Sequence, residues 1–353
     1  MNDVKQFNTI WMSLTYSCNN LCEWCYTGSN IDGSKNFNLK RESKVIDLLS
    51  SLLVKKIILI GGEPTLYHNI GGIISKISKR KIISGMVSNG RRFKDKDFVR
   101  RVKDSGLNYL AISICGPDAL SHDKVTKVNG SFYETLLGIR NSLSYGINTT
   151  TNTVIGKSNK SRLEEMVDLL REENIKEMTF NICGVCLSKE SNNDNILSPK
   201  ESIQTFERVY KYAKSQGITA RLITPMPLCL FERDIREELV NKKLVSGGPC
   251  QLVYGRNFVI EYNGDIVPCT HLAHFPFFNI FENERIITKK EFVKRYNKRE
   301  EIPLQFREKI SRYPSTKCED QNCNELCSGG CPLFWTKFDP DKEIPGINSS
   351  SNN

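Results

Sequence analysis

Short apolar runs alternate with amphipathic helical patterns from residue 8 to about residue 225. The apolar runs predict strands, and the stretches with a helical period predict helices that cover the sheet. The expected strands are Thr9–Thr15, Lys56–Ile60, Ile82–Val87, Tyr109–Ile114, Thr149–Ile155, Glu177–Ile182 and Thr219–Ile223. The expected helices are Lys40–Leu53, Ile70–Ser78, Asp95–Asp104, Ser131–Tyr145, Ser161–Glu173 and Ser198–Gln216.

Capping-box patterns mark three of the expected helix starts. They pair Ser131 with Glu134, Ser161 with Glu164, and Ser198 with Glu201. Strands that alternate with helices predict a parallel sheet, and six or seven such units favour an α/β fold built as a partial (β/α)6 TIM-like barrel. The active site of such a barrel is expected at the carboxyl ends of its strands.

The pattern changes after Cys229, and this change suggests the domain boundaries. Residues 1–230 are expected to form the barrel, and residues 231–249 a linker in which a polar helical stretch, Phe231–Val245, leads to Gly247-Gly248-Pro249. A hairpin with its turn at Asn263-Gly264 opens a cysteine-rich domain, residues 250–338, which has little apolar core and is expected to fold around metal. The tail, residues 339–353, is expected to be disordered.

Composition narrows the class of protein. The chain has 353 residues, 39% hydrophobic and 25% charged, with no apolar run long enough to span a membrane and no signal-peptide core. A cytoplasmic protein is therefore expected, in which 13 cysteines indicate metal or cluster ligation rather than disulfides. The net charge of +10 comes from scattered lysines and arginines, which makes nucleic acid an unlikely partner and an acidic peptide or acidic electron donor a better one.

Three cysteines follow the first expected strand within eight residues: Cys18, Cys22 and Cys25. Three thiolates can hold three irons of a [4Fe–4S] cluster, which leaves the fourth iron without a protein ligand. That iron can take an exogenous chelate, such as the amino and carboxylate groups of an amino acid. A zinc site or an electron-carrying cluster is the alternative that the spacing alone leaves open.

The CxxxCxxC spacing at the end of a first barrel strand resembles the radical S-adenosylmethionine (SAM) superfamily. The resemblance implies a [4Fe–4S] cluster on Cys18, Cys22 and Cys25, with SAM as the second cofactor. Trp24 fills the aromatic position before the third cysteine, where the family loop contacts adenine. In that family, an electron from the cluster cleaves SAM, and the resulting radical removes hydrogen from the substrate.

The second strand ends in Gly61-Gly62-Glu63-Pro64, which resembles the family's GGEP motif. By this resemblance the backbone at Gly61 and Gly62 and the carboxylate of Glu63 hold the ammonium group of SAM. Two residues without Cβ atoms would let the chain approach the ligand closely. Taken alone, the motif equally describes a tight turn between a strand and a helix.

Later strand ends carry further matches to the family. Ser88 and Asn89 belong to a Ser-Asn-Gly motif similar to the family's TNG, which lies near the ribose. Ser113 is kept as a SAM contact, but Cys115 stands where relatives have an acid. Asn152, on the fifth strand, is a weaker candidate for the SAM carboxylate or ribose, with strand capping as its alternative role.

The C-terminal cysteines resemble the SPASM domain, which carries auxiliary clusters in radical SAM enzymes. Cys250, Gly264 and Cys269 match its opening, whereas the later cysteines depart from its spacing. The resemblance implies one or two auxiliary iron–sulfur clusters, each short of one cysteine, which leaves room for substrate, water, His271 or a carboxylate such as Asp339. The implied ligand sets are Cys250, Cys269 and Cys331 for one cluster, and Cys318, Cys323 and Cys327 for the other. One complete cluster with two spare thiols, or a structural zinc, is the alternative.

Two other side chains have expected positions. Cys183 follows the sixth strand and is a candidate hydrogen-atom donor, although a buried cysteine more often simply packs. His122 is expected in a surface loop.

The SPASM resemblance implies a ribosomally made peptide as substrate, modified by crosslinking or another oxidation. The alternative enzyme class is dehydrogenation or epimerisation of a small molecule, such as an aminoglycoside precursor. The remote alternative is a non-catalytic iron–sulfur or zinc protein. A flavodoxin or ferredoxin-type electron donor is expected as a partner, and a separate leader-peptide-binding protein is a further candidate.

Overall fold

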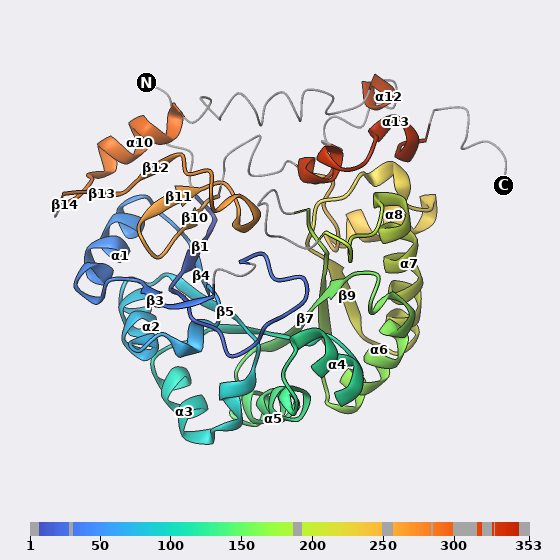
Figure 1. Cartoon of the computed structure of the whole chain (residues 1–353), viewed down its shortest axis with the longest axis horizontal. Helices are drawn as coiled ribbons and strands as arrows, with labels where there is room; N and C mark the ends of the chain where they lie inside the picture. The colour runs from blue at the N-terminus through green and yellow to red at the C-terminus, as the bar shows by residue number, and fades with distance from the viewer. Residues whose placement is uncertain are drawn as a thin grey trace.

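Parallel strands in chain order form the central sheet. They are β1 (Thr9–Ser13), β4 (Lys56–Ile60), β5 (Ile83–Ser88), β6 (Tyr109–Ser113), β7 (Thr149–Ile155), β8 (Glu177–Ile182) and β9 (Thr219–Leu222). The computed structural model describes residues 7–27, 31–185, 193–248, 257–283, 285–298, 316–319, 327 and 329–345. The strands curve around a common axis with the helices outside them, which confirms the predicted partial barrel (Figure 1).

Helices connect these strands and cover the outer face of the sheet. They are α1 (Glu42–Ser51), α2 (Ile70–Lys79), α3 (Lys96–Asp104), α4 (Ala119–Thr126), α5 (Ser131–Ser144), α6 (Leu163–Glu172), α7 (Pro199–Ser215) and α8 (Arg233–Asn241). The main core lies between sheet and helices, because alternate strand residues such as Ile57 and Leu59 point outward. Their neighbours Ile58 and Ile60 belong to a separate apolar cluster on the inner face.

Some expected element boundaries differ from the structure. Of the three expected capping boxes, only Ser198 caps its helix as expected, accepting a hydrogen bond from the Glu201 N–H at 3.2 Å. Helix α5 has Gly130 as its N-cap, so Ser131 is already its first helical residue. The structure adds α4, which the sequence patterns did not predict.

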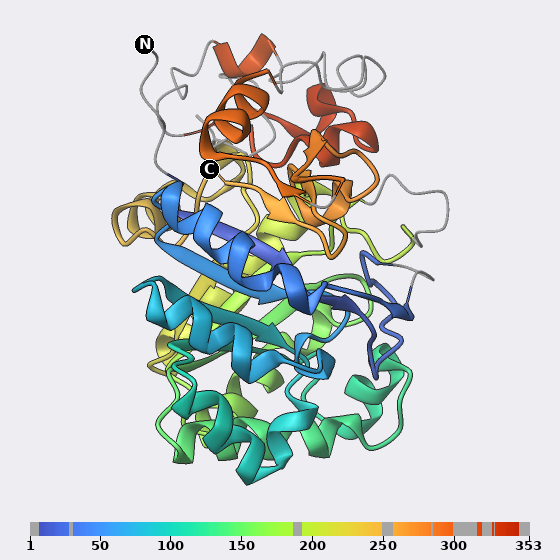
Figure 2. The same cartoon turned by 90° about the vertical axis from the view of Figure 1, so that its left-hand side faces the viewer.

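The C-terminal region joins the same sheet at the free edge of β1. Strand β10 (Val259–Ile260) pairs in parallel with β1, and β11 (Asp265–Val267) pairs with β10 as the predicted hairpin. Strand β12 (Phe278–Asn279) follows, and Figures 1 and 2 place these elements beside β1. The barrel and the cysteine-rich region therefore share one continuous sheet.

Contacts between aromatic rings stabilise the junction between β1 and the C-terminal region. Phe7, before β1, contacts Phe258 edge-on with ring centroids 5.1 Å apart. Phe258 in turn contacts Phe292 of α10 (Lys289–Asn297) at 5.3 Å. The remaining C-terminal elements are β13 (Phe281–Glu282), β14 (Arg285–Ile286), α12 (Thr316–Glu319) and α13 (Pro340–Glu343).

The expected linker carries the helix that its polar helical stretch predicted, and the expected disordered tail is ordered where the structure describes it. The expected linker contains α8, whose Ile235 and Leu239 are buried in the main core. The expected tail begins with α13, and Ile344 after it is also buried. In both segments, a few apolar residues within a polar stretch pack against the main core. Across the described ranges, none of the helices combines the length and apolar character needed to cross a bilayer.

Candidate active site at the carboxyl ends of the strands

The cysteine loop, residues 17–27, continues from the end of β1 and carries Cys18, Cys22 and Cys25. All three side chains are half-buried. The Asn20 N–H donates to Cys18 Sγ at 3.4 Å, and Cys25 Sγ lies 2.8 Å from Thr27 Oγ1. The loop thus fixes the direction of at least two thiols.

The thiols of this loop influence one another's ionisation. Burial raises the pKa of Cys18 to about 12, against the lowering effect of the Asn20 hydrogen bond. Burial also raises the pKa of Cys22, and the charges of Cys115, Cys25 and Cys18 raise it further. Iron would supply the positive charge that such neighbouring thiolates need. The donor set therefore fits an iron–sulfur cluster.

A site for a single metal ion needs a different arrangement of ligands from a site for a cluster. Within the described part of the chain, no three His, Cys, Asp or Glu side chains converge as ligands of one metal ion. In a [4Fe–4S] cube, each cysteine binds a different iron, so the three sulfur atoms need not converge on one point.

The Gly61–Gly62 turn packs directly on the strand end that leads into the cysteine loop. Gly61 has φ +147°, and a Cβ atom there would lie 2.3 Å from Thr15 O. A Cβ atom on Gly62 would lie 2.4 Å from Ser17 O. The Gly62 N–H donates to Thr15 O at 2.7 Å. A side chain at either glycine would thus collide with the backbone between Thr15 and Ser17. The sequence did not reveal this packing role.

Glu63 is buried, with 1% of its surface exposed, and its carboxylate joins two strand ends. Its Oε1 accepts hydrogen bonds from the Thr65 N–H at 3.1 Å, the Thr65 hydroxyl at 2.7 Å and the Ser88 hydroxyl at 2.8 Å. Its Oε2 accepts one from the Asn89 N–H at 2.7 Å. Burial raises the pKa of Glu63, and these hydrogen bonds oppose that shift. Glu63 and Ser88 are thus hydrogen-bonded to each other. Their contacts with SAM, expected from the sequence, remain predictions.

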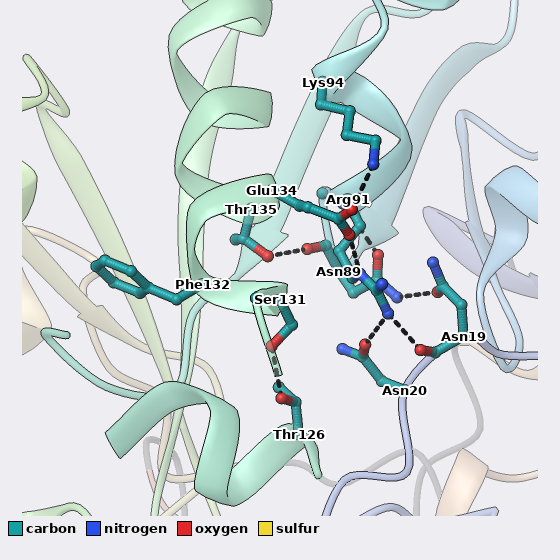
Figure 3. Close-up of polar contacts among 12 residues, drawn as sticks. Asn19, Asn20, Asn89, Arg91, Lys94, Thr126, Ser131, Phe132, Glu134 and Thr135 are labelled. Atoms are coloured by element: carbon teal, nitrogen blue, oxygen red, sulfur yellow. Dashed lines mark hydrogen bonds and ion pairs between the residues drawn. The ribbon is translucent and has the colours of Figure 1, made fainter. Parts of the chain in front are cut away.

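Asn89 reaches the cysteine loop. Its Nδ2 donates to Asn19 Oδ1 at 2.7 Å, and its own Oδ1 accepts from the Arg91 N–H at 3.1 Å. Figure 3 shows Arg91 between Asn19 and Asn20 on one side and Glu134 of α5 on the other. Sequence reasoning missed Arg91 and assigned Glu134 to a helix cap. An arginine directly after the Ser-Asn-Gly motif was the only signal in the sequence.

A directed chain of hydrogen bonds crosses the inner face of the sheet. The Thr224 hydroxyl accepts from the Ile182 N–H at 2.9 Å and donates to Asn181 Oδ1 at 3.3 Å. Asn181 Nδ2 then donates to Asn152 Oδ1 at 2.7 Å. Asn152 is half-buried beside Ser113 on β6, and among the described residues none accepts a hydrogen bond from its Nδ2. The chain orients the Asn152 amide so that this donor is available to a ligand.

The other predicted side chains have simpler surroundings. Trp24 is partly buried against the main core, and Cys183 is buried in that core with 3% of its surface exposed. His122 is only 1% exposed, so its predicted place in a surface loop was wrong. It is buried because α4 folds back on the Cys115 turn, where the Cys115 N–H donates to His122 Nδ1 at 3.3 Å.

The C-terminal cysteines are partly described. Cys269, Cys318, Cys327 and Cys331 are half-buried, whereas Cys250 and Cys323 lie outside the described residues. Cys327 Sγ accepts hydrogen bonds from the Leu228 N–H at 3.4 Å and the Gly329 N–H at 3.3 Å. Backbone donors to sulfur are typical of thiolate ligands in iron–sulfur sites. The surroundings of Cys327 are therefore compatible with its predicted role as an auxiliary ligand, which stays a prediction.

Comparison with known families agrees with this arrangement. Residues 12–170 match the model of the Radical SAM superfamily. The chain contains a radical SAM domain. The cysteine loop, the Gly61–Gly62 turn and the strand ends through β7 all lie inside the matched residues. A [4Fe–4S] cluster and SAM, the cofactors predicted from the sequence, are the cofactors of this domain.

Relatives extend the comparison beyond this domain. The chain is 26% identical over 221 residues to Fe-coproporphyrin III synthase of Methanosarcina barkeri, covering 61% of this chain and 54% of that protein. It thus spans about half the length of that relative. In fold it resembles Streptococcus suis SuiB, solved with its precursor peptide SuiA, at TM-score 0.68 and 17% identity over 92% of this chain and 72% of SuiB. It also resembles anSMEcpe, solved with AdoMet and a peptide, at TM-score 0.69 and 15% identity over 95% of both chains.

Proposed function

We propose that the radical SAM domain of this protein removes a hydrogen atom from a ribosomally made peptide, which then undergoes crosslinking or another oxidative change. When bound, the cluster and SAM supply a 5′-deoxyadenosyl radical for this step. Cys18, Cys22 and Cys25 would hold the cluster. The protein's own contribution is to position both groups and to keep water from the radical.

The extent of the fold similarity carries this proposal. The likeness to SuiB and anSMEcpe covers 92% and 95% of this chain, and so includes the C-terminal region as well as the radical SAM domain. Both of those proteins were solved with a peptide bound. Because β10 extends the sheet from β1, the cysteine-rich region adjoins the strand that leads into the cysteine loop. A peptide between them would contact both.

Several residues would share the binding of SAM. The Asn152 Nδ2 is oriented to donate to an acceptor such as a carboxylate, with Ser113 beside it. Trp24 would contact the adenine from the cysteine loop. Glu63, through Ser88 and the Asn89 N–H, would fix the backbone on which the amino-acid end of SAM rests.

The proposal also covers the auxiliary sites and the partners. Cys250, Cys269, Cys318, Cys323, Cys327 and Cys331 would hold one or two auxiliary iron–sulfur clusters, which would accept the electron left after hydrogen abstraction. Cys183 would return a hydrogen atom only if the product requires it. A flavodoxin or ferredoxin-type protein would deliver electrons in the cytoplasm, and a separate protein could bind the leader part of the peptide.

A small-molecule substrate is the second candidate. Fe-coproporphyrin III synthase, to which 61% of this chain aligns, is named for a product that is not a peptide. A dehydrogenase or epimerase acting on a small molecule, such as an aminoglycoside precursor, would use the same radical SAM domain.

The test is anaerobic reconstitution with iron, sulfide, SAM and dithionite, followed by measurement of 5′-deoxyadenosine. Peptides encoded by short reading frames beside the gene are then added, and their masses are measured. A peptide that loses two hydrogens per modification supports the proposal. Release of 5′-deoxyadenosine with conversion of a sugar precursor and unchanged peptides would support the second candidate. Absence of 5′-deoxyadenosine under all conditions would refute both.

A further inference from the structure

The cysteine loop is fastened to the barrel at separate points along its length. At its start, Ser17 O accepts from the Glu63 N–H at 2.7 Å. In its middle, the Leu21 N–H donates to Thr126 O at 2.9 Å and the Glu23 N–H donates to Val125 O at 3.0 Å, both at the end of α4. Between these two attachments lie Asn19 and Asn20, the residues that directly follow Cys18.

Arg91 holds this intermediate part. Its Nη1 donates to Asn19 O and, at 2.8 Å, to Asn20 Oδ1. Asn20 is buried, and the Arg91 side chain is only 14% exposed. An arginine suits the task because its planar group presents several donors in fixed directions. One side chain thus restrains two consecutive residues of the loop (Figure 3).

Glu134 holds the arginine in turn. Its Oε2 accepts from Arg91 Nε at 2.6 Å, and its Oε1 accepts from Lys94 Nζ. Burial raises the pKa of Glu134, but the hydrogen bonds from Lys94 and Arg91 outweigh it and hold the pKa below its ordinary value. The carboxylate is therefore ionised at neutral pH and pairs with both cations. Glu134 lies in the first turn of α5, which is well anchored: the Asp123 carboxylate accepts from the Phe132 N–H at 2.8 Å.

The position of Arg91 also has an electrostatic consequence. Its guanidinium contacts both residues that directly follow Cys18, so a fixed cation lies beside the cysteine loop. A cluster held by three thiolates places negative charge in a half-buried loop, and a fixed cation beside it reduces that cost. Geometry and charge therefore point the same way.

We propose that Arg91 is a positioning residue for the cluster, holding the loop segment between Cys18 and Cys22 in the conformation that binds iron, and that Glu134 fixes Arg91 for this task. The inference needs the cluster of the radical SAM domain but not the peptide substrate. It would survive if the substrate proved to be a small molecule.

The chain offers a matched control next to Arg91. Arg92 lies in the same 3-10 turn, η3 (Arg91–Lys94), and is also half-buried. Its guanidinium contacts Thr65 O and lies over the Phe98 ring at 4.5 Å, and none of its described contacts is with the cysteine loop. Arg91→Met and Arg92→Met thus remove the same kind of side chain from the same turn.

The experiment compares these variants after anaerobic reconstitution. The first readout is the rate at which a chelator removes iron, and the second is the EPR spectrum of the reduced protein with and without SAM. The change on adding SAM reports the cluster in the cysteine loop and not auxiliary clusters. We expect Arg91→Met to lose this SAM-responsive cluster about tenfold faster, which corresponds to about 1.4 kcal/mol, because the charge-assisted hydrogen bonds to Asn19 and Asn20 are lost. Arg92→Met should resemble the unmodified protein.

Two milder variants keep the proposal testable if Arg91→Met does not fold. Arg91→Lys keeps the charge but cannot reach both Asn19 and Asn20 with one rigid group, and Glu134→Gln weakens the hold on Arg91. Both should show intermediate rates and an altered SAM-responsive EPR signal. The proposal is overturned if every folded Arg91 or Glu134 variant matches Arg92→Met in both readouts. It is also overturned if melting of the iron-free protein falls while the EPR signal and the rate stay unchanged.

Discussion

The two cysteine-rich regions of the molecule are supported in different ways. The cysteine loop receives hydrogen bonds from the Gly61–Gly62 turn, α4 and Arg91, so much of its shape is built by the barrel around it. In the described part of the second region after residue 315, no helix is longer than five residues, and the contacts to the barrel include the Cys331 N–H to Pro225 O at 2.8 Å and the Gly330 N–H to Gly247 O at 3.2 Å. The difference suggests that metal serves the first region in chemistry and the second also in folding.

Removing a thiol from the cysteine loop should give the largest effect. Cys18→Ala, Cys22→Ala and Cys25→Ala should each abolish 5′-deoxyadenosine formation, because the cluster would lose a ligand. Since backbone contacts hold the loop, the iron-free protein should melt within about 2–4 °C of the unmodified one, which corresponds to about 1 kcal/mol. Product assay and circular dichroism measure the two effects.

Cys229→Ala is the control, because this half-buried cysteine lies outside all three predicted ligand sets. It should retain both activity and melting temperature. Cleavage of SAM that persists in all three loop variants would show that the cluster is held elsewhere.

The second region should respond in the opposite sense. Cys327→Ala removes a sulfur that accepts two backbone hydrogen bonds and, by proposal, binds an auxiliary cluster. We expect roughly four fewer irons per chain, as for one [4Fe–4S] cluster, and faster proteolysis of residues 316–345. Formation of 5′-deoxyadenosine should persist. Unchanged iron content and unchanged proteolysis would remove Cys327 from the ligand set and weaken the contrast between the regions.

A smaller effect should follow from disturbing the support of the cysteine loop. Gly61→Ala would place a Cβ atom 2.3 Å from Thr15 O at a φ of +147°. We expect a loss of roughly 2–4 kcal/mol in the free energy of unfolding, from overpacking and backbone strain together. Urea titration of the iron-free protein measures it.

Gly130→Ala is the matched control, because Gly130 has φ +80° but its added Cβ would meet no described residue beyond its immediate chain neighbours within 4 Å. It should lose only about 1 kcal/mol, the cost of a left-handed backbone alone. Equal losses in the two variants would show that the contact between the Gly61–Gly62 turn and Thr15 does little to support the loop.

Local patterns in the sequence predicted the sheet well and the support of the site poorly. The bounds of β4, β7 and β8 match their predicted ranges, because a strand is marked by its own run of apolar or β-branched residues. The contacts of Arg91 join residues 43 and 72 positions apart, and no short pattern encodes such pairs. Glu134 shows the consequence: its spacing from Ser131 indicated a helix cap, but the fold uses it for Arg91. The cysteines themselves were identifiable because their spacing is local.

The smallest predicted effect concerns the chain of hydrogen bonds from Thr224 to Asn152 on the inner face of the sheet. Neither cysteine-rich region takes part in this chain. Thr224→Val keeps the shape of the side chain but removes the hydroxyl that fixes the Asn181 amide, so Asn152 can turn its oxygen toward the ligand. The loss of one hydrogen bond, about 1 kcal/mol, should raise the KM for SAM about fivefold while kcat and iron content stay unchanged. Thr219→Val, at the exposed start of β9, whose last residue Leu222 lies two positions before Thr224, is the control. A fall in kcat with unchanged KM would mean that this chain of side chains orients the reacting groups instead of binding SAM.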